Sequence, residues 1–453
     1  MTMDQPNLKI SNIAIHTVGF ETGQRRRSES TVFQKVSVLV LCLTLIFAIL
    51  AFGAVDDWST FTLEAATAAL FLVWAARQII CGQIALSNHA LYPPTFLFFG
   101  IILAQIALRQ SAYGYVTKHQ ALLYISYGIL FLIAAEWLTD EGSRRLFAQV
   151  MTIFGTLYAF FALVQGLRLN GRVFWIHSPQ VTGALIYGSY VNSNHYAGLM
   201  ELLVPIPVVL CAGKLLKGEM RVLAGFCAAL MATTIFLSLS RGGMLAFLIE
   251  MALFAAVILP KGRNLRVVVG FIALGVVILG LLIVVGNARA LGRLGDLSPG
   301  IRLDITKDCW KMFLRRPVLG WGMGAFPTVY PGYRSFYTND FVNEAHNDYA
   351  QLLVESGVLG FGAMIWFLIL LYLHGLPRSR RWEFKWDGAL SLAALLGCTG
   401  IVFHSFVDFN LQIPANAAVF YVLCALAASR LRPRSSSSGH RRSIQGDDES
   451  HLD

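Results

Sequence analysis

Long apolar runs alternate with short polar segments along most of the chain. The runs are about 17 to 25 residues long, the length with which an α-helix crosses a bilayer. We expect spans at roughly 34–54, 60–80, 92–108, 120–138, 147–167, 195–212, 221–239, 243–259, 266–286, 349–373, 388–406 and 413–430. This pattern predicts an all-α polytopic membrane protein with about 12 transmembrane helices.

The polar segments set the expected domain organisation. Residues 1–33 are expected to form a cytoplasmic tail, and residues 34–430 the transmembrane domain. The segment 287–346 is expected to be a long outer (periplasmic) loop between the ninth and tenth spans. The serine-rich and basic segment 431–453 is predicted to be a disordered cytoplasmic tail.

The basic residues predict the orientation. Of 36 lysines and arginines, 23 fall in segments that are inner if the N-terminus is cytoplasmic, and 5 fall in the short outer segments. Cytoplasmic loops of membrane proteins carry such an excess, so both termini are assigned to the cytoplasm. The same bias accounts for the net charge of +10 without a nucleic-acid partner.

Overall composition agrees with a membrane protein, and the cysteine pattern bears on whether a disulfide or a zinc site is expected. The chain is 56% hydrophobic and 14% charged, whereas soluble domains average about 25% charged residues. Its 7 cysteines contain no Cys-x-x-Cys pair and lie mostly in apolar runs. We therefore expect neither a structural disulfide nor a zinc site.

Arg241 and His346 are the candidate catalytic residues on the predicted outer face. Arg241 lies in "SLSRGGML" between two apolar runs, where an ionisable group faces a cavity or a partner, or anchors a helix end. A guanidinium there can bind phosphate. His346 precedes a helix that Asn347 or Asp348 can cap, so it is either a general base or a histidine that is hydrogen-bonded at a helix terminus.

Further polar residues are predicted to line the same outer region. Asp348, Gln351 and Glu355 recur at helical spacing, so they share one face of the helix that forms the tenth span. The remaining candidates lie at the ends of spans. Asn192, Asn194 and His195 begin the sixth, Glu344 precedes the tenth, and His404 and Asp408 are at the end of the eleventh. His404 and Asp408 are four residues apart, so a direct pair between them is predicted, and this pair either locks two helices together or is catalytic.

The long loop also shows internal order. Ile301, Ile305, Cys309 and Met312 predict one face of a helix that ends before Pro317, and the glycines of "GWGMG" predict a tight turn. Tyr333 and Arg334 lie in a segment rich in aromatic residues, with Trp321, Phe326, Tyr330 and Tyr337. Such rings stack on sugars or form an ordinary interfacial belt.

Four stretches together resemble the O-antigen ligase and O-antigen polymerase superfamily of bacterial envelope enzymes. They are "YVNSNHYAGLMELLVP" (190–205), "SLSRGGMLAF" (238–247), "RPVLGWGMGAFPTVYPGYR…NEAHNDYAQLLVESGVLG" (316–360) and "HSFVDFNLQIPANAAVF" (404–420). The resemblance implies a helical, GT-C-like enzyme of the inner membrane. Such an enzyme transfers a glycan from an undecaprenyl diphosphate carrier to an acceptor hydroxyl, without a metal or other cofactor.

The resemblance also implies residue roles. Arg241 would bind the diphosphate, and His346 would be the base or would orient the acceptor. The candidates for substrate binding are Asn192, Asn194, His195, Tyr333, Arg334, Glu344, Asn347, Asp348, Gln351, Glu355, His404 and Asp408. Many ligases carry an arginine shortly before the Asn-x-Asn stretch, but residues 178–193 contain none, so Arg172, Arg334 or His195 would supply that charge.

Three alternatives stay open at this stage. Ligase and polymerase share the motifs. A transporter or flippase would have internal repeats and broken helices near the bilayer centre, and we expect neither in this chain. A non-catalytic envelope scaffold is the third possibility, and the presence of Arg241 and His346 argues against it.

Overall fold

The structure is a computed structural model that describes residues 32–82, 86–167, 172–176, 186–258, 270, 299–338 and 341–431. Within these ranges the regular elements are helices, apart from one isolated bridge between Tyr187 and Tyr190. Nine described helical segments are long and apolar enough to cross a membrane. The prediction of an all-α polytopic membrane protein is thus confirmed.

The helices follow the predicted spans. In chain order they are Val32–Leu50, α2 (Asp57–Ile80), α3 (Tyr92–Ala107), α4 (Gly114–Trp137), α5 (Glu141–Leu167), α6 (Ser193–Leu203), α7 (Pro205–Ala212), α8 (Gly218–Leu237), α9 (Arg241–Ile258), α14 (Asp348–Ser379), α15 (Trp386–His404) and α16 (Pro414–Ala428). Together they match every predicted span except 266–286. Apart from residue 270, that span lies outside the described residues, as do residues 1–31, 287–298 and 432–453.

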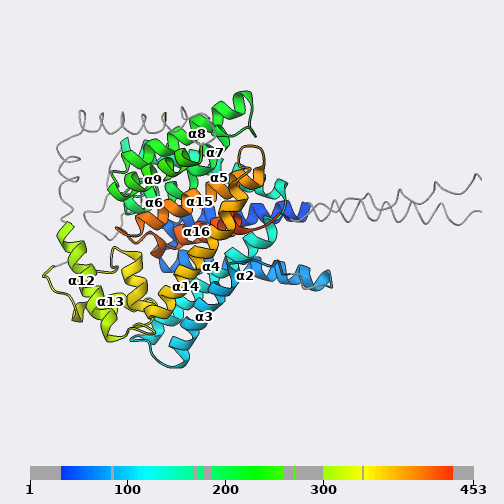
Figure 1. Cartoon of the computed structure of the whole chain (residues 1–453). Coiled ribbons are helices and arrows are strands. Elements are labelled where there is room, and N and C mark those ends of the chain that lie inside the picture. Colours follow the sequence, from blue (N-terminus) through cyan, green and yellow to red (C-terminus); the bar gives the residue numbers. More distant parts are fainter. Residues whose placement is uncertain are drawn as a thin grey trace, which may run out of the picture.

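The most buried helices lie in the middle of the bundle. Figure 1 shows α15 and α16 between a group that contains α6 to α9 and a group that contains α2, α3 and α14. Nearly every residue of α6, α15 and α16 is buried. In contrast, α2 exposes large apolar side chains such as Leu72 and Ile79, as expected of a helix that faces lipid.

The long loop forms a small domain of its own beside the bundle. It contains α12 (Pro299–Arg315), α13 (Phe326–Val329) and η3 (Tyr330–Gly332). Ile305, Cys309 and Met312 are buried against Phe326 and Tyr330, which confirms the predicted apolar face of α12. Ile301 is the exception, because it is 49% exposed at the start of that helix.

α14 is broken near its beginning, contrary to the prediction that the helices are unbroken. Gly357 has φ 64° and ψ −167°, a left-handed conformation that other residues rarely adopt. The break separates a short polar segment, Asp348–Ser356, from the apolar helix that follows. The polar start of this predicted span is therefore a separate helical segment, which explains why its composition differs from the rest.

Backbone groups of the long loop fill the break. The amides of Val358 and Leu359 donate to the carbonyls of Pro317 and Val318, at 2.8 and 3.4 Å. In the other direction, the Gly322 amide donates to the Glu355 carbonyl at 3.0 Å. The hydrogen bonds that α14 loses at Gly357 are thus replaced by bonds to the loop.

Glycines and one glutamine make this close approach possible. Gly320, Gly322 and Gly324 all have positive φ, which confirms the predicted tight turn. A Cβ on Gly320 would lie 2.5 Å from the Glu355 backbone. The buried Gln105 side chain of α3 donates to the carbonyls of Leu319 and Glu355, at 2.6 and 2.7 Å, and so holds the loop and α14 together.

Candidate functional site

Several helix ends meet around Asp408, which lies between α15 and η4 (Asn410–Gln412). Its side chain is 1% exposed. Asn194 Nδ2 at the start of α6 donates to Asp408 Oδ2 at 2.5 Å. The chain therefore brings together residues that are 214 positions apart.

Three basic side chains face the same carboxylate. His195 Nε2 and His346 Nδ1 lie 3.9 and 3.8 Å from Asp408 Oδ1, and Arg302 Nη2 lies 3.8 Å from Oδ2. Burial alone would raise the pKa of Asp408. The basic neighbours outweigh burial and hold its pKa well below the usual range; in decreasing order of effect they are His346, His195, His404 and Arg302. Asp408 is thus an ionised carboxylate around which basic side chains gather.

His346 is held in an unusual backbone conformation. Its φ is 51°, a left-handed conformation, which is rare outside glycine and marks strain at functional sites. Asn347 caps α14 by accepting from the amides of Tyr349 and Ala350, which confirms one of the two predicted caps. The His346 side chain is 32% exposed, and its Nδ1 has no hydrogen-bond partner among the described residues.

His195 and His346 pack against the same aromatic ring. The Phe409 ring meets both imidazoles edge to face, with centroids 4.6 Å from His195 and 4.9 Å from His346. Asn192 caps α6 by accepting from the Asn194 amide, so its described role is structural. His195 Nε2 also has no hydrogen-bond partner in the described part of the chain.

Arg241 begins α9 directly beside this cluster. A Cβ on the next residue, Gly242, would lie 2.5 Å from His404 Nε2 and 3.0 Å from Val407. The start of α9 therefore packs on the turn 404–408, the same turn that carries Asp408. The Arg241 side chain is exposed and forms no ion pair with the described residues.

The expected direct pair between His404 and Asp408 is not formed. His404 Nδ1 instead lies 2.9 Å from Glu201 Oε1 on α6. The imidazole and this carboxylate are both buried, at 1% and 0% exposure. The spacing in the sequence predicted Asp408 as the partner of His404. In the structure, α15 packs against α6, and Glu201 of α6 is the partner of His404.

The four acidic and amide candidates around the start of α14 divide between two places. Asp348 Oδ2 accepts from Ser405 Oγ at 2.7 Å and from the Leu411 amide at 3.1 Å, so Asp348 belongs to the turn beside Asp408. Gln351, Glu344 and Glu355 bond mainly to the loop or to each other. Gln351 Nε2 donates to Glu344, its Oε1 accepts from the Ala345 amide, and Glu355 Oε1 accepts from the Phe326 amide.

Glu344 lies outside the membrane-spanning segments and has a perturbed carboxyl. Burial raises the pKa of Glu344 to about 8, although the hydrogen bond from Gln351 opposes this shift. The nearby carboxylates of Glu355 and Asp348 add to the increase. The carboxyl therefore holds its proton in the neutral pH range.

Tyr333 and Arg334 lie in the aromatic core of the loop domain. The Tyr333 ring meets Trp321 edge to face at 5.8 Å, and the Arg334 amide donates to the Tyr330 carbonyl at 3.1 Å. These contacts are within this core, and none of them joins Tyr333 or Arg334 to Asp408. Their predicted roles in substrate binding stay predictions.

Three residues of this region escaped the sequence analysis. Arg302 lies in the first turn of α12, and its side chain reaches Asp408. Glu201 and Glu250 lie inside apolar spans and are fully buried. A lone carboxyl in such a span points to a function, and that signal would have identified both.

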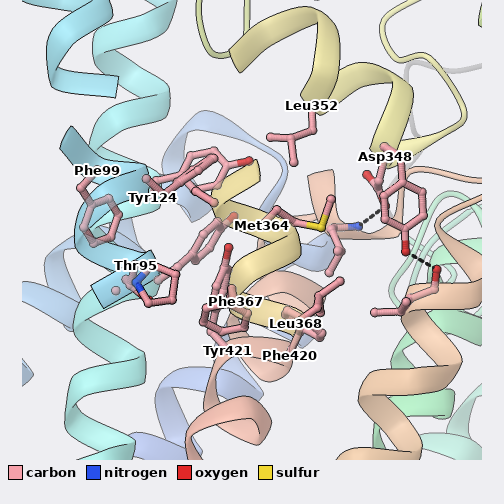
Figure 2. A pocket seen from close by; sticks show the side chains of 18 of the residues that line it. Thr95, Phe99, Tyr124, Asp348, Leu352, Met364, Phe367, Leu368, Phe420 and Tyr421 are labelled. Carbon is pink, nitrogen blue, oxygen red and sulfur yellow. Dashed lines mark hydrogen bonds between the residues drawn. The ribbon is translucent and has the colours of Figure 1, made fainter. Parts of the chain in front are cut away.

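An apolar pocket opens next to Asp348. Its volume is about 110 Å³, and it runs along α14 between α3, α4 and α16. Figure 2 shows Asp348 at one end of the lining and the rings of Tyr124, Phe367 and Tyr421 further along. A second pocket, of about 270 Å³ between α2, α3 and α4, shares Thr95, Phe99 and Gly128 with the first. The polar cluster thus adjoins apolar space inside the bundle.

The fold and the cluster define a multi-pass membrane protein whose polar residues converge at one end of its helices. Residues 226–365, from α8 into α14, match the model of a family described as O-antigen ligase, which confirms the resemblance to the O-antigen ligase and polymerase superfamily. The match includes Arg241, Arg302 and His346. No curated protein matches the chain. The family supports a bacterial inner-membrane location, a glycosyltransferase-like enzyme and a role in cell-surface glycan biosynthesis.

Proposed function

We propose that the protein transfers a glycan from an undecaprenyl-diphosphate-linked donor to an acceptor hydroxyl at the outer face of the inner membrane. One observation carries the proposal: the turn 404–408 packs against the start of α9, which bears Arg241, and also presents Asp408 to His346. A cation for the leaving group and a base for the acceptor thus flank a single turn. The family match to O-antigen ligases supports the same chemistry.

Arg241 is the group that binds the diphosphate. Its guanidinium stays charged at any working pH and makes bidentate contacts with phosphate oxygens. It begins α9, and the N-terminus of a helix favours an anion through its free amides and its dipole. As the glycosyl bond breaks, negative charge grows on the diphosphate, and fixed cations stabilise that charge most.

His346 is the base that activates the acceptor hydroxyl. Asp408 Oδ1 lies 3.8 Å from Nδ1, which leaves Nε2 for the hydroxyl proton. Hydrogen bonds of this kind are often longer before the substrate binds. Because Asp408 stays ionised, it stabilises the imidazolium that forms after proton transfer, as the carboxylate does in related triads.

Arg302 supplies the second positive charge that the family pattern led us to seek. The sequence suggested Arg172, Arg334 or His195 for this role. The structure places Arg302 Nη2 3.8 Å from Asp408 Oδ2, with the side chain 27% exposed. Arg302 therefore has both the charge and the access to meet a second phosphate oxygen.

The apolar pocket beside Asp348 suits part of the polyprenyl chain of the donor. Its lining is mostly aromatic and aliphatic, and the second pocket continues the apolar space towards α2. A lipid tail placed there would leave its diphosphate near the polar cluster. This arrangement follows the usual division of a ligand site into an apolar body and a few polar groups.

The broken helix α14 does not support the alternative function of a transporter. Broken helices in transporters line a path for the substrate. Here the loop residues 317–322 occupy the break at Gly357, and their backbone groups bond to both of its sides. The break is therefore a docking point for the loop.

Gene deletion and complementation test the proposed function. The deletion should change the surface polysaccharide: carrier-linked polymer should accumulate for a ligase, and acceptors capped with a single unit should accumulate for a polymerase. Wild-type protein should restore the product, whereas the Arg241→Ala and His346→Ala variants should not. Glu64→Gln, a change on α2 away from the cluster, is the control. Unchanged polysaccharide after deletion would reject the proposal.

A further inference from the structure

Two carboxyl groups and an imidazole form a buried column that the proposed transfer does not use. Glu201 on α6 and Glu250 on α9 are both 0% exposed, and His404 at the end of α15 is 1% exposed. Glu201 Oε2 and both oxygens of Glu250 have no hydrogen-bond partner among the described residues. Unpaired carboxylates in apolar surroundings are costly, so such groups are retained for a function.

Three glycines create the space for this column. A Cβ on Gly400 would overlap Glu250 Oε1, and a Cβ on Gly243 would lie 3.0 Å from Glu201 Oε1. As described above, Gly242 leaves the corresponding space for His404 Nε2. Each polar side chain therefore faces a glycine on a neighbouring helix, which indicates that the packing accommodates these groups specifically.

The column runs from the start of α9 into the bundle. Gly242 and His404 lie at its outer end, and Glu201 follows at 2.9 Å from the imidazole. Glu250 is nine residues beyond Arg241 on the same helix, which corresponds to about 14 Å at 1.5 Å per residue. His404 therefore lies directly beneath the helix start to which we assign the diphosphate.

All packed elements contribute titratable groups to these surroundings. Glu201 and His195 come from α6, and Glu250 comes from α9. His404 and Cys398 come from α15, Asp408 from the turn after α15, and Asp348 from α14. Carboxyl groups predominate, and Glu201, Glu250 and His404 are buried. An anion that binds at the start of α9 is repelled by any carboxylate that is ionised in this low-dielectric region.

We propose that the Glu201–His404 pair, with Glu250 beneath it, takes up a proton when undecaprenyl diphosphate binds beside Arg241. This inference rests on the proposed function. A neutral His404 beside an ionised Glu201 gives the pair a net charge of −1, and protonation of the imidazole changes it to 0. Proton uptake therefore removes a negative charge from beneath the bound diphosphate. Glu201 is the positioning residue, because it fixes the ring through Nδ1.

Calorimetry on the full-length protein in lipid nanodiscs tests this inference. Undecaprenyl diphosphate is titrated at pH 7.5 in two buffers with different ionisation enthalpies, so the difference in heat gives the protons taken up per lipid. At this pH the phosphate, with a second pKa of about 6, contributes little. We expect wild-type protein to take up a fraction of one proton, His404→Gln less than half of that, and Glu64→Gln the wild-type value.

The outcomes separate the inference from the proposed function. If wild-type protein and His404→Gln take up equal numbers of protons, or neither takes up any, the inference is overturned while lipid binding still supports the donor class. If wild-type protein does not bind undecaprenyl diphosphate, the proposed donor itself is rejected. Glu201→Gln is the second variant should His404→Gln fail to fold, and Glu201→Asp should restore part of the uptake.

Discussion

Two polar regions of this protein differ in how completely their hydrogen bonds are satisfied. At the break in α14, the side chains of Gln105, Gln351 and Glu355 have backbone or side-chain partners. In the cluster around Asp408 and in the adjoining column of Glu201 and Glu250, several buried atoms lack one in the described part of the chain: His195 Nε2, His346 Nδ1, Asp348 Oδ1, Glu201 Oε2 and the Glu250 carboxyl. Both regions looked alike in sequence, since each is polar in an apolar setting.

This difference in hydrogen bonding separates polar side chains that stabilise the fold from polar side chains that are available for a function. Buried polar groups in folded proteins nearly always have partners, so satisfied groups need no further explanation. Groups that remain unpaired keep donors and acceptors available for a ligand. We therefore assign the break to holding the loop domain in place, and the cluster to chemistry. The following predictions test that division.

Arg241→Ala should have the largest effect on activity. Loss of a fixed charge that stabilises the leaving group costs about 10²- to 10³-fold in kcat. Donor binding should weaken as well, while the amount of protein in the membrane stays normal. Transfer assays on isolated membranes with a defined undecaprenyl-diphosphate-linked donor measure this, and near-normal turnover would remove Arg241 from the site.

His346→Ala should lower kcat by about 10²-fold or more, the contribution typical of a general base. The KM for the donor should change little, because His346 acts on the acceptor. Asp408→Asn should reduce kcat as well, since it removes the charge that faces His346 Nδ1. If His346→Ala lowered kcat and donor affinity equally, His346 would be a residue that binds the donor and would not be the general base.

Gly357→Ala tests the other region and should reduce stability. The new Cβ would clash with the Val318 carbonyl, and the left-handed backbone is strained for alanine, at a cost of about 1–3 kcal/mol. The melting temperature in detergent should fall, while the kcat of the folded fraction should stay close to wild type. Gly362→Ala, a position with open space, is the matched control. A large loss of kcat at unchanged stability would give the break a catalytic role.

Glu344→Gln should have a smaller effect, which is a change in how the stability of the protein depends on pH. The pKa of Glu344 is raised to about 8 from 4.5, so the folded protein holds the proton more tightly than the unfolded chain does. Its contribution to stability is therefore present at low pH and is lost progressively as pH rises from about 4.5 to about 8. Glu344→Gln should flatten the decline in melting temperature over this range, and a slope identical to wild type would contradict the assignment.

Chelation should have the smallest effect. We propose that cationic side chains do the work that a metal ion would otherwise do, so EDTA should leave transfer unchanged. Loss of activity that Mg²⁺ or Mn²⁺ restores would show instead that the unpaired carboxyls bind a metal. Protein treated with EDTA and then returned to excess Ca²⁺ controls for effects on lipid.

Run length and charge predicted the architecture well, but not the tertiary partners. The apolar spans fix helix positions because length alone decides whether a helix can cross a bilayer. The break at Gly357 was not predicted, since a glycine in an apolar run is tolerated and the loop that fills the gap is about 40 residues earlier. His404 was assigned Asp408, because local spacing cannot reveal a carboxylate on α6 that is 203 residues away.

The interlock between residues 317–322 and the break in α14 limits how this protein can be recombined with its relatives. A chimera with a junction at position 346 would pair the loop of one parent with the helix segment of another. The two backbones would then have to match without having been selected together. A junction after Leu359 keeps both partners from one parent, because the amides of Val358 and Leu359 also bond to the loop. Exchanging 299–359 as a single cassette therefore preserves the interlock.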